Sequence, residues 1–478
     1  MAKSALQHAL RLVASASLVV VLAACKTFSP DAGMDLVAAV ADRELRKDVV
    51  AVRREDDAFA ARARVEGLLA RPLTADAAVQ IALLNNRALQ AAYNELAIAE
   101  ARMVGASLPP NPTVFLARLS GSLESEIERA IAANILALAT LPVRTAIAGD
   151  RFYQAQLQAG VETLRVATAT RRAYYRAVAA REVAGFLAQA QSAAETAAQL
   201  ARRLGETGAL NKLDQAREQV FYADLTTQLA AARQRAESER ERLTRLLGLW
   251  GRDLAFRLPD ALPRLPRHTE RLLAVEIEAI RRRIDLQIAR IEVDALAKSY
   301  GLSNATRFIN LLEAAGVSKT KREAGNDPIR KRGLDVEFQI PLFDFGEVRV
   351  REAEASYLWA VNRLTDMAVQ VRSQARDAYR VYRSSHDIAG HYLREVLPLR
   401  KIISEETQLR YGAMQIDEFA LLAEARQRIA ATINAIGAAR DFWLAQVDLL
   451  AAVVGGGADA ERDDPGPMAA AEGGARGH

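Results

Sequence analysis

The sequence predicts a mainly α-helical fold with a small β part, in which long antiparallel coiled-coil helices carry a twofold internal repeat. Three observations predict this fold. The 478 residues include only 14 Pro and 26 Gly, while the helix-favouring residues Ala, Leu, Arg, Gln and Glu are abundant. Two helical stretches are far longer than the average globular helix. The same order of segments occurs once in each half of the chain.

The charge distribution argues against nucleic acid as a partner. The chain has 64 Lys and Arg against 59 Asp and Glu, a formal net charge of +5. The two signs are interleaved along the chain and form no basic tail or stripe. With 50% hydrophobic residues, 26% charged residues and a single cysteine, the chain is expected to fold mostly in water and without disulfide bonds.

Residues 1–24 are predicted to be a signal peptide. A basic start precedes an apolar run over residues 12–24 that is too short to span a bilayer. Residues 22–25, Leu-Ala-Ala-Cys, resemble the lipobox of bacterial lipoproteins. This resemblance implies a covalent lipid on Cys25, and Lys26 in place of Asp implies sorting to the outer membrane. The alternative is an ordinary signal peptide with an incidental cysteine.

Two segments lie outside the predicted repeats. Residues 25–72 are expected to form a charged and lipidated N-terminal leader, helical or extended. Residues 455–478 are rich in Gly, Ala and Asp and lack an apolar period. This composition predicts a disordered tail.

Two repeats of similar organisation are predicted at residues 73–272 and 273–454. Residues 86–95 recur in outline as residues 283–292, and both runs have helical patterns. Each run is followed by a break, a strand-like region, a very long helix and a second helix that returns. Because the repeated unit covers nearly half of the chain, it indicates a duplicated architecture.

Each repeat is predicted to contain one helical hairpin, at about residues 149–249 and about residues 347–453. The long helices end in short turns that contain Gly208 and Gly412. Glycine tolerates the left-handed backbone that stops a helix and reverses the chain. In the second hairpin, apolar positions of the returning helix alternate in steps of three and four, as in a coiled-coil seam.

Each repeat is also predicted to contain one β-hairpin. In the first repeat, strands are expected at residues 113–122 and 133–141, within a strand region of about 113–141. In the second repeat, the strand region covers about residues 307–340. The highly charged residues 318–333 are expected to form a long exposed loop within it.

The clearest strand covers residues 334–340, and its partner is expected at residues 307–315. Its apolar side chains alternate with Asp335, Glu337 and Gln339, so one face is apolar and the other wet. Four strands cannot close a barrel, and no open sheet edge is tolerated in hydrocarbon. If these strands meet lipid, subunits must therefore assemble. The alternative is a small soluble sheet that caps a helical bundle.

Several segments, taken in order, resemble the TolC-like outer-membrane efflux proteins. Residues 73–86, LTADAAVQIALLNN, resemble the opening helix of that family. Residues 106–112, ASLPPNP, precede the first strand, and residues 341–346, PLFDFG, lead into the second long helix. The resemblance covers residues 73–454 and depends on the order and spacing of these segments.

This resemblance implies a homotrimer in the outer membrane. Each subunit would give four strands to a 12-stranded transmembrane β-barrel and its helices to a periplasmic α-barrel tube. The tube would be the passive outer-membrane duct of a tripartite efflux pump, joined to a periplasmic adaptor (membrane fusion) protein and an inner-membrane pump. Asp335, Glu337 and Gln339 would then line the barrel lumen.

The family often carries acidic residues just after the glycine of each hairpin tip. The matching positions here are Asp214 and Glu418, with Asp417 beside Glu418. Together with Gly208 and Gly412 they are expected to form the periplasmic entrance, where three copies of each acid would favour cations. The alternative is that Asp214 and Asp417 only begin the returning helices, where acids interact favourably with the helix dipole.

Catalytic, metal and nucleotide sites are not predicted. The five His are scattered, and there is no HExxH, no GxxxxGK[ST] and no GxGxxG. We therefore expect no enzyme activity, no metal and no cofactor besides the lipid. The alternative function is a nonconducting periplasmic helical lipoprotein that acts as a scaffold or adaptor. The four strands and the twofold repeat argue against it, because a simple coiled-coil scaffold needs neither.

Overall fold

The computed structural model describes residues 28–122, 124–269, 274–323 and 326–457. The chain divides into two compact units. The first, here named the sheet unit, contains the described residues up to Val37, together with Tyr93–Ala159 and Asp285–Ala368. The second, here named the hairpin unit, contains Ala38–Ala92, Gly160–Ile284 and the described residues from Val369 onward.

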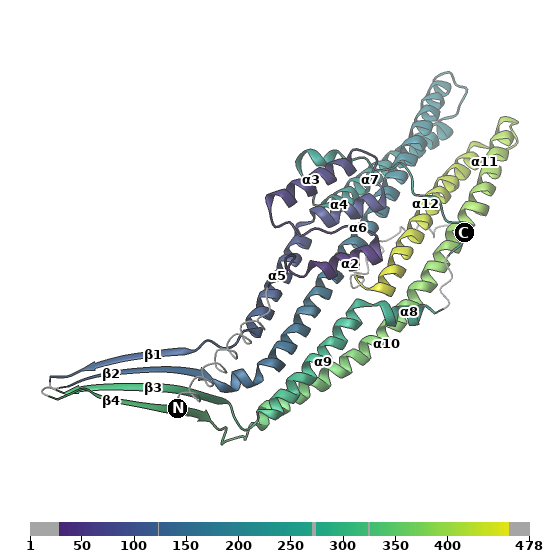
Figure 1. Ribbon diagram of the computed structural model, residues 1–478. Coiled ribbons are helices and arrows are strands. Elements are labelled where there is room, and N and C mark those ends of the chain that lie inside the picture. Colours follow the sequence, from purple (N-terminus) through teal and green to yellow (C-terminus); the bar gives the residue numbers. More distant parts are fainter. Residues whose placement is uncertain (1–27, 123, 270–273, 324–325, 458–478) are drawn as a thin grey trace. The chain divides into compact units, whose positions relative to one another are not determined.

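The sheet unit is built around four antiparallel strands in the order β1-β2-β3-β4 (Figure 1). The strands are β1 (Thr113–Ser120), β2 (Glu124–Asn134), β3 (Leu311–Glu323) and β4 (Ile329–Gln339). Strands β2 and β3 join the two halves of the chain, and β1 and β4 are the edges of the sheet within one chain. The expectation of a mainly helical fold with a small four-stranded part is confirmed.

The predicted strand over residues 133–141 is wrong. β2 ends at Asn134, and helix α6 begins at Ile135. The side-chain oxygen of Asn134 accepts a hydrogen bond from the backbone N–H of Ala137 at 2.7 Å, which satisfies one of the free N–H groups at a helix start. Pro142 consequently lies inside α6.

The predicted exposed loop over residues 318–333 is also wrong, because most of it is strand. β3 begins later than expected and continues to Glu323, and β4 begins at Ile329. Lys319 Nζ lies 3.0 Å from Glu128 Oε1, and Lys321 Nζ lies 2.7 Å from Glu124 Oε2 on β2. Two of the charges that suggested a loop, those of Lys319 and Lys321, are therefore paired across strands.

Four long helices lead into or away from the sheet. They are α5 (Arg87–Ser107), α6 (Ile135–Glu206, 72 residues), α9 (Ile284–Ala305) and α10 (Glu347–His391). Within the sheet unit, Lys298 Nζ pairs with Asp150 Oδ2 at 2.5 Å. The side-chain amide of Gln154 donates to the carbonyl oxygen of Ile288 at 3.2 Å. These polar contacts fix α9 against the first part of α6.

The turn before α10 requires glycine at position 346. Gly346 has φ +72°, and a Cβ placed on it would lie 2.1 Å from the carbonyl oxygen of Arg307. Its N–H donates to Asp344 Oδ1 at 3.1 Å, and the N–H of Phe345 donates to the carbonyl oxygen of Pro341 at 2.8 Å. The PLFDFG segment is therefore a tight turn that directs the chain from β4 into α10.

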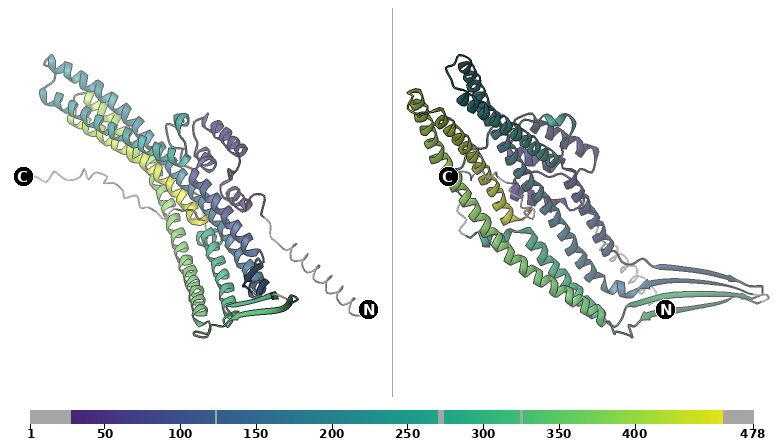
Figure 2. Two further views of the ribbon diagram at one scale, coloured as in Figure 1. Left: turned by 90° about the vertical axis from the view of Figure 1, so that its left-hand side faces the viewer. Right: turned by 180° about the vertical axis from the view of Figure 1, so that it is seen from behind.

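The hairpin unit contains two helical hairpins (Figure 2). In the first, α6 is followed by α7 (Lys212–Leu247); in the second, α11 (Leu397–Gly412) is followed by α12 (Glu418–Val454). A π-helical turn (Tyr392–Val396) separates α10 from α11, and Pro398 follows as the second residue of α11. The second long helix is thus interrupted where the missing N–H of proline leaves a carbonyl without its helical partner.

A buried apolar cluster packs helices of both hairpins together. Phe221, Leu225 and Leu229 recur every four residues on α7 and form one stripe. They pack with Leu187 and Ala194 of α6 and with Leu422 of α12. Ile429 and Ile433 of α12 lie against this cluster, and Ile429 is one of the positions of the seam predicted for the returning helix.

The opening segment LTADAAVQIALLNN stabilises the end of α7. It forms α4 (Ala75–Asn85), and the side-chain amide of Asn85 donates to the carbonyl oxygens of Leu247 at 3.0 Å and Gly248 at 2.7 Å. Asn86 donates to the carbonyl oxygen of Leu246 at 2.9 Å. These bonds satisfy carbonyl groups that have no partner within the helix.

Shorter helices complete the described chain. They are α2 (Met34–Leu45), α3 (Glu55–Leu69), α8 (Val275–Arg282) and a 3₁₀ turn (Gly251–Ala255). The predicted leader thus contains two helices in its described part. Across the described ranges, none of the helices combines the length and the apolar character that crossing a membrane requires.

Candidate functional site

The first hairpin tip is a short turn between α6 and α7. Gly208 adopts φ +74°, as expected for a glycine that reverses the chain. Asn211 caps α7, and its side-chain oxygen accepts from the N–H of Asp214 at 2.9 Å. Asp214 in turn accepts from Arg217 Nη1 at 3.0 Å. Asp214 therefore lies in the first turn of α7, with a neighbouring cation on its own helix.

The second hairpin tip differs from the prediction at its glycine. Gly412 is the last residue of α11, and the left-handed residue is Met414, with φ +58° and a side chain that is 93% exposed. Asp417 caps α12, and its Oδ1 accepts from the N–H of Ala420 at 2.9 Å. The chain thus reverses two residues beyond Gly412, in a turn closed by hydrogen bonds such as Gln415 N–H to the carbonyl oxygen of Arg410 at 2.9 Å.

Glu418 meets a second buried carboxyl group near these tips. Glu418 is the first residue of α12, and Glu218 lies in the second turn of α7; each side chain is only 8% exposed. The two carboxyl groups are within hydrogen-bonding reach of each other. The Oε2 atom of Glu218 is buried and has no hydrogen-bond partner of its own among the described residues.

This arrangement changes the acidity of both groups. Burial, followed by the hydrogen bond to Glu218 and the charges of Glu218 and Asp214, raises the pKa of Glu418 to about 7, while Arg217 acts in the opposite direction. Burial also raises the pKa of Glu218. Two like charges this close do not ionise independently, so the pair holds a proton at pH values where isolated carboxyls have lost theirs.

Tyr411 belongs to the same cluster. Burial and then the negative charges of Glu418, Glu218 and Asp214 raise the pKa of its hydroxyl group. Tyr411 and Glu218 were not predicted as site residues. For Glu218 a signal existed, because it lies four residues after Asp214 on one face of α7. The contact with Glu418 depends on packing between helices that are remote in sequence, which periodicity cannot reveal.

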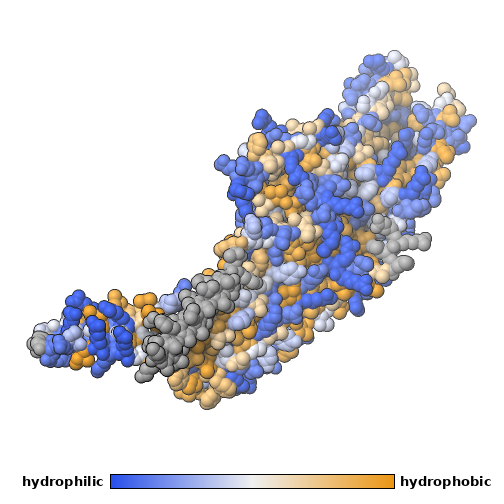
Figure 3. Space-filling view, in the orientation of Figure 1, coloured by the Kyte–Doolittle hydropathy of each residue, from blue (hydrophilic) through white to orange (hydrophobic). Residues whose placement is uncertain are grey.

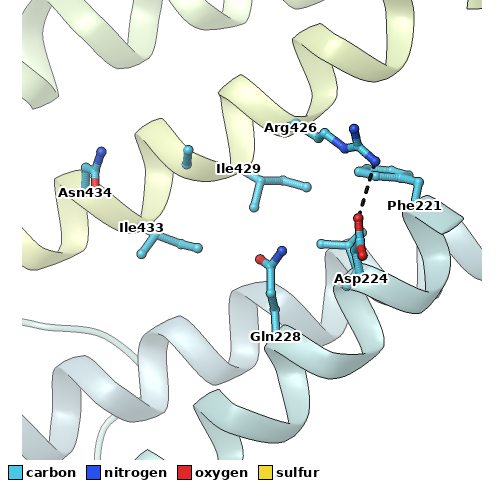
Figure 4. Close-up of a pocket in the computed structure, with 9 residues that line it drawn as sticks. Phe221, Asp224, Gln228, Arg426, Ile429, Ile433 and Asn434 are labelled. Atoms are coloured by element: carbon cyan, nitrogen blue, oxygen red, sulfur yellow. Dashed lines mark hydrogen bonds and ion pairs between the residues drawn. The ribbon is translucent and has the colours of Figure 1, made fainter. Parts of the chain in front are cut away.

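A groove of about 480 Å³ runs between α7 and α12 beyond the acidic pair (Figure 4). The side chains of Ile429 and Ile433 enter it from α12, and Gln228 enters it from α7. Arg426 Nη2 lies 3.4 Å from Asp224 Oδ2, at the end shown in the upper part of the figure. The one carboxylate of the lining, Asp224, is paired with Arg426, and the remaining lining side chains are apolar or amides.

The residues predicted for a barrel lumen share one face of the sheet. Asp335, Glu337 and Gln339 are exposed and alternate along β4. In the register of the sheet, Glu337 lies opposite Glu313 and Asp335 opposite Ala315 of β3. The lysine–glutamate pairs of β2 and β3 also lie on this face, because paired residues of neighbouring strands point to the same side. We name it the charged face.

The opposite face of the sheet, here named the apolar face, exposes large hydrophobic side chains. These are Val114 (72% exposed), Leu116 (71%), Ile131 (61%), Leu334 (75%), Val336 (48%) and Phe338 (60%). Figure 3 shows that hydrophilic residues gather over the part of the sheet that lies farther from the helices. A face with so much exposed apolar surface indicates contact with lipid or with another subunit.

Two further predictions concern lipidation and metal binding. Cys25, the predicted lipidation site, lies outside the described residues. Among the residues that the structure describes, no group of three or more His, Cys, Asp or Glu side chains is arranged to hold a metal ion.

Comparison by sequence finds no counterpart for this chain. No family model matches it, and no curated protein matches it. Comparison of structures does find counterparts.

Three solved structures illustrate the similarity. A membrane protein from Pseudomonas aeruginosa aligns with a TM-score of 0.69 and 17% identity, over 82% of this chain and 92% of its own. The CmeC outer membrane channel of Campylobacter jejuni aligns with a TM-score of 0.68 and 15% identity, over 81% and 87%. CusC, whose structures are described in terms of transmembrane channel formation, aligns with a TM-score of 0.67 and 14% identity, over 82% and 92%.

Identities this low establish the fold alone. The resemblance to TolC-like outer-membrane efflux proteins, inferred from the order of segments in the sequence, is confirmed at that level. The chain has the fold of these outer-membrane channels.

Proposed function

We propose that this protein is the outer-membrane channel of a tripartite efflux pump. One observation supports this proposal most directly. The four-stranded sheet has an apolar and a charged face, and its edge strands β1 and β4 have no partner on their outer sides among the described residues. In a membrane such edges must be paired. Three copies would pair β4 of one subunit with β1 of the next and close a 12-stranded barrel.

The helical hairpins would then form a tube below the barrel. The first half of the chain contains, in order, α4, α5, β1, β2, α6 and α7. The second half contains their counterparts in the same order: α8, α9, β3, β4, the interrupted helix α10–α11, and α12. This supports a twofold repeat with boundaries at residues 73–272 and 273–454. Three subunits with two hairpins each would give a tube of pseudo-sixfold symmetry, in which long helices pack as in coiled coils.

The tips of the hairpins would meet a periplasmic adaptor protein that links the tube to an inner-membrane pump. Energy would come from the pump, and this protein would conduct its substrates passively to the cell exterior. Removal of residues 1–24 and acylation of Cys25 would anchor each subunit in the outer membrane. Several acyl chains on one residue anchor a protein firmly, whereas one chain gives marginal binding.

Electrical recording tests the conducting role. The full-length protein, purified from membranes in detergent, is added to planar lipid bilayers, and discrete current steps of uniform size are expected. Insertion without current at any voltage would contradict a conducting channel. It would favour the alternative of a helical lipoprotein that serves as a scaffold or adaptor.

A further inference from the structure

The apolar face of the sheet carries a group of arginines at the end remote from the helices. Five exposed arginines project from this face: Arg118, Arg129, Arg322, Arg330 and Arg332. We propose that they form an arginine belt that binds the phosphate groups of lipids in the outer leaflet of the membrane. The inference rests on the proposed function, because it requires the sheet to be part of a transmembrane barrel.

The strand register places the five side chains on the same face. Ser318 of β3 lies between Arg129 of β2 and Arg332 of β4, so these three residues form one row across the sheet. Thr320 lies opposite Arg330 in the next row. Since neighbouring strands are about 4.8 Å apart, the backbones of Arg129 and Arg332 are about 10 Å apart.

The remaining two arginines extend the belt to the other strands. Arg118 of β1 lies opposite Ile127, which lies opposite Thr320, so Arg118 is in the same row as Arg330. Arg322 lies opposite Ser125 one row farther out. Every strand therefore contributes, and a closed trimer would carry the belt around its whole circumference.

The two faces of the sheet are sorted by charge. All Asp and Glu residues of β1–β4 lie on the charged face: Glu124, Glu126, Glu128, Glu313, Glu323, Asp335 and Glu337. Within these strands, every lysine also lies on that face, and every arginine lies on the apolar face. Over β1–β4 as the structure describes them, the apolar face thus has five positive charges and no negative one.

Ion pairs follow the same division. The ion pairs between strand residues are Lys319–Glu128, Lys321–Glu124 and Lys321–Glu323, all on the charged face. Within the described ranges, none of the five arginines pairs with a carboxylate. An exposed group of like charges is stabilised by an external anion, because its mutual repulsion is otherwise uncompensated.

The position along the strands indicates where that anion lies. Next to the helices, the apolar face carries Val336, Phe338 and Leu334, which suit contact with acyl chains. Arg332 and Arg330 follow on the same strand, two and four residues beyond Leu334. At about 3.4 Å per residue, the first of them lies about 7 Å farther along β4. If the helices extend into the periplasm, this end of the barrel reaches the headgroups of the outer leaflet.

The choice of arginine matches phosphate as the ligand. Guanidinium groups bind phosphate through two parallel N–H···O bonds, which a lysine ammonium group cannot form. Long arginine side chains can also keep their stems along apolar surface while the charged end reaches the headgroup layer. A lipid with a phosphate headgroup fits both parts of this face. Its acyl chains would contact the apolar residues nearer the helices, and its phosphate would bind the arginines farther along the strands.

A binding experiment with matched variants tests the belt. The full-length protein is reconstituted into nanodiscs of phosphatidylcholine with a small fraction of diphosphorylated lipid A, and bound lipid A is quantified after purification. The double variant R330Q/R332Q is expected to retain about tenfold less lipid A, because charge-assisted hydrogen bonds are lost. Lys331→Gln removes a charge between these two residues but on the charged face, and it is expected to retain as much as the unchanged protein.

The other possible outcomes would each overturn a specific part of this proposal. Equal loss in Lys331→Gln and R330Q/R332Q would overturn the belt in favour of general charge attraction, and no loss in either would overturn it as well. Retention of free inorganic phosphate in place of lipid A would overturn the lipid as ligand. Electron microscopy of the same nanodiscs separates the two proposals: inserted trimers without lipid A preference overturn the belt alone, whereas failure to insert overturns the proposed function.

Discussion

Glu218 of α7 and Glu418 of α12 bring two buried carboxyl groups together near the hairpin tips. These residues belong to different hairpins, so the pair joins the two halves of the chain at the proposed periplasmic entrance. In the family that the sequence resembles, a second acid is common one turn beyond the position of Glu418, where this chain has Leu421. Here the second carboxyl group comes from α7. The charge at this proposed entrance would therefore depend on a pair that shares a proton.

This pair predicts that the packing between the hairpins weakens as pH rises. Because the pKa of Glu418 is raised from 4.5 to about 7, the folded state binds a proton more tightly than the unfolded state does. The resulting stabilisation is complete below pH 4.5 and is lost as pH rises through about 7. Glu418→Gln, which cannot ionise, is expected to be more stable than the unchanged protein at pH 8 by about 1–2 kcal/mol, after allowance for solvent screening at the tip.

Thermal unfolding followed by circular dichroism at pH 5 and pH 8 checks this expectation. The exposed carboxyl group of Glu405, which faces Lys401 at 3.8 Å, provides a control. Glu405→Gln should leave the pH dependence unchanged. If Glu418→Gln also leaves it unchanged, the carboxyl pair does not govern the stability of the tips.

Asp417 allows its two predicted roles to be separated. Its side chain caps α12, and an asparagine at this position would still cap the helix. Asp417→Asn is therefore expected to preserve stability, whereas Asp417→Ala is expected to cost about 1 kcal/mol. If Asp417 also contributes to an entrance ring that favours cations, both variants should reduce cation selectivity, measured as the reversal potential in planar bilayers. Unchanged selectivity in Asp417→Asn would leave capping as its sole role.

The sheet predicts a clear asymmetry between neighbouring residues of β4. Val336 lies on the apolar face and Glu337 on the charged face. Val336→Arg is expected to impair assembly in the membrane, since an arginine on a lipid-facing position costs about 2–4 kcal/mol near the bilayer centre. Glu337→Gln is expected to assemble normally. Both variants are compared by the amount of trimer in isolated outer membranes. Equal amounts of trimer for the two variants would contradict the barrel.

Gly346 is expected to tolerate no side chain. Gly346→Ala would combine a strained φ of +72° with a Cβ that lies 2.1 Å from the carbonyl oxygen of Arg307, and strain of this kind costs about 1–3 kcal/mol before the clash is added. Gly333 of β4 has open space around the position that a Cβ would take, so Gly333→Ala serves as the control. Comparison of Tm and membrane yield would show a loss only in Gly346→Ala; equal values would contradict the tight-turn interpretation.

The sequence predicted the elements whose signal is local. Long stretches rich in helix-favouring residues indicate the helices, and the alternation of Val336 and Phe338 with Glu337 indicates a strand with one apolar side. The extent of the β-hairpins was not predictable in this way. Lys319 and Lys321 look like loop residues until Glu128 and Glu124 of the neighbouring strand are known.

The candidate site was predicted only in part for the same reason. Asp417 and Glu418 follow a recognisable turn, and a single helix suffices to place them. Glu218 becomes significant only through contact with another hairpin, which depends on tertiary packing. Likewise, Arg129 and Arg332 share a row only because β3 lies between their strands. Residues of this kind have no signal in a sequence window.

Electron microscopy of the membrane-extracted, detergent-purified protein tests the central claim most directly. A channel of the proposed type predicts threefold particles with a hollow tube longer than roughly 100 Å, since α6 alone has 72 residues at about 1.5 Å per residue. A compact monomer or a solid rod would contradict it.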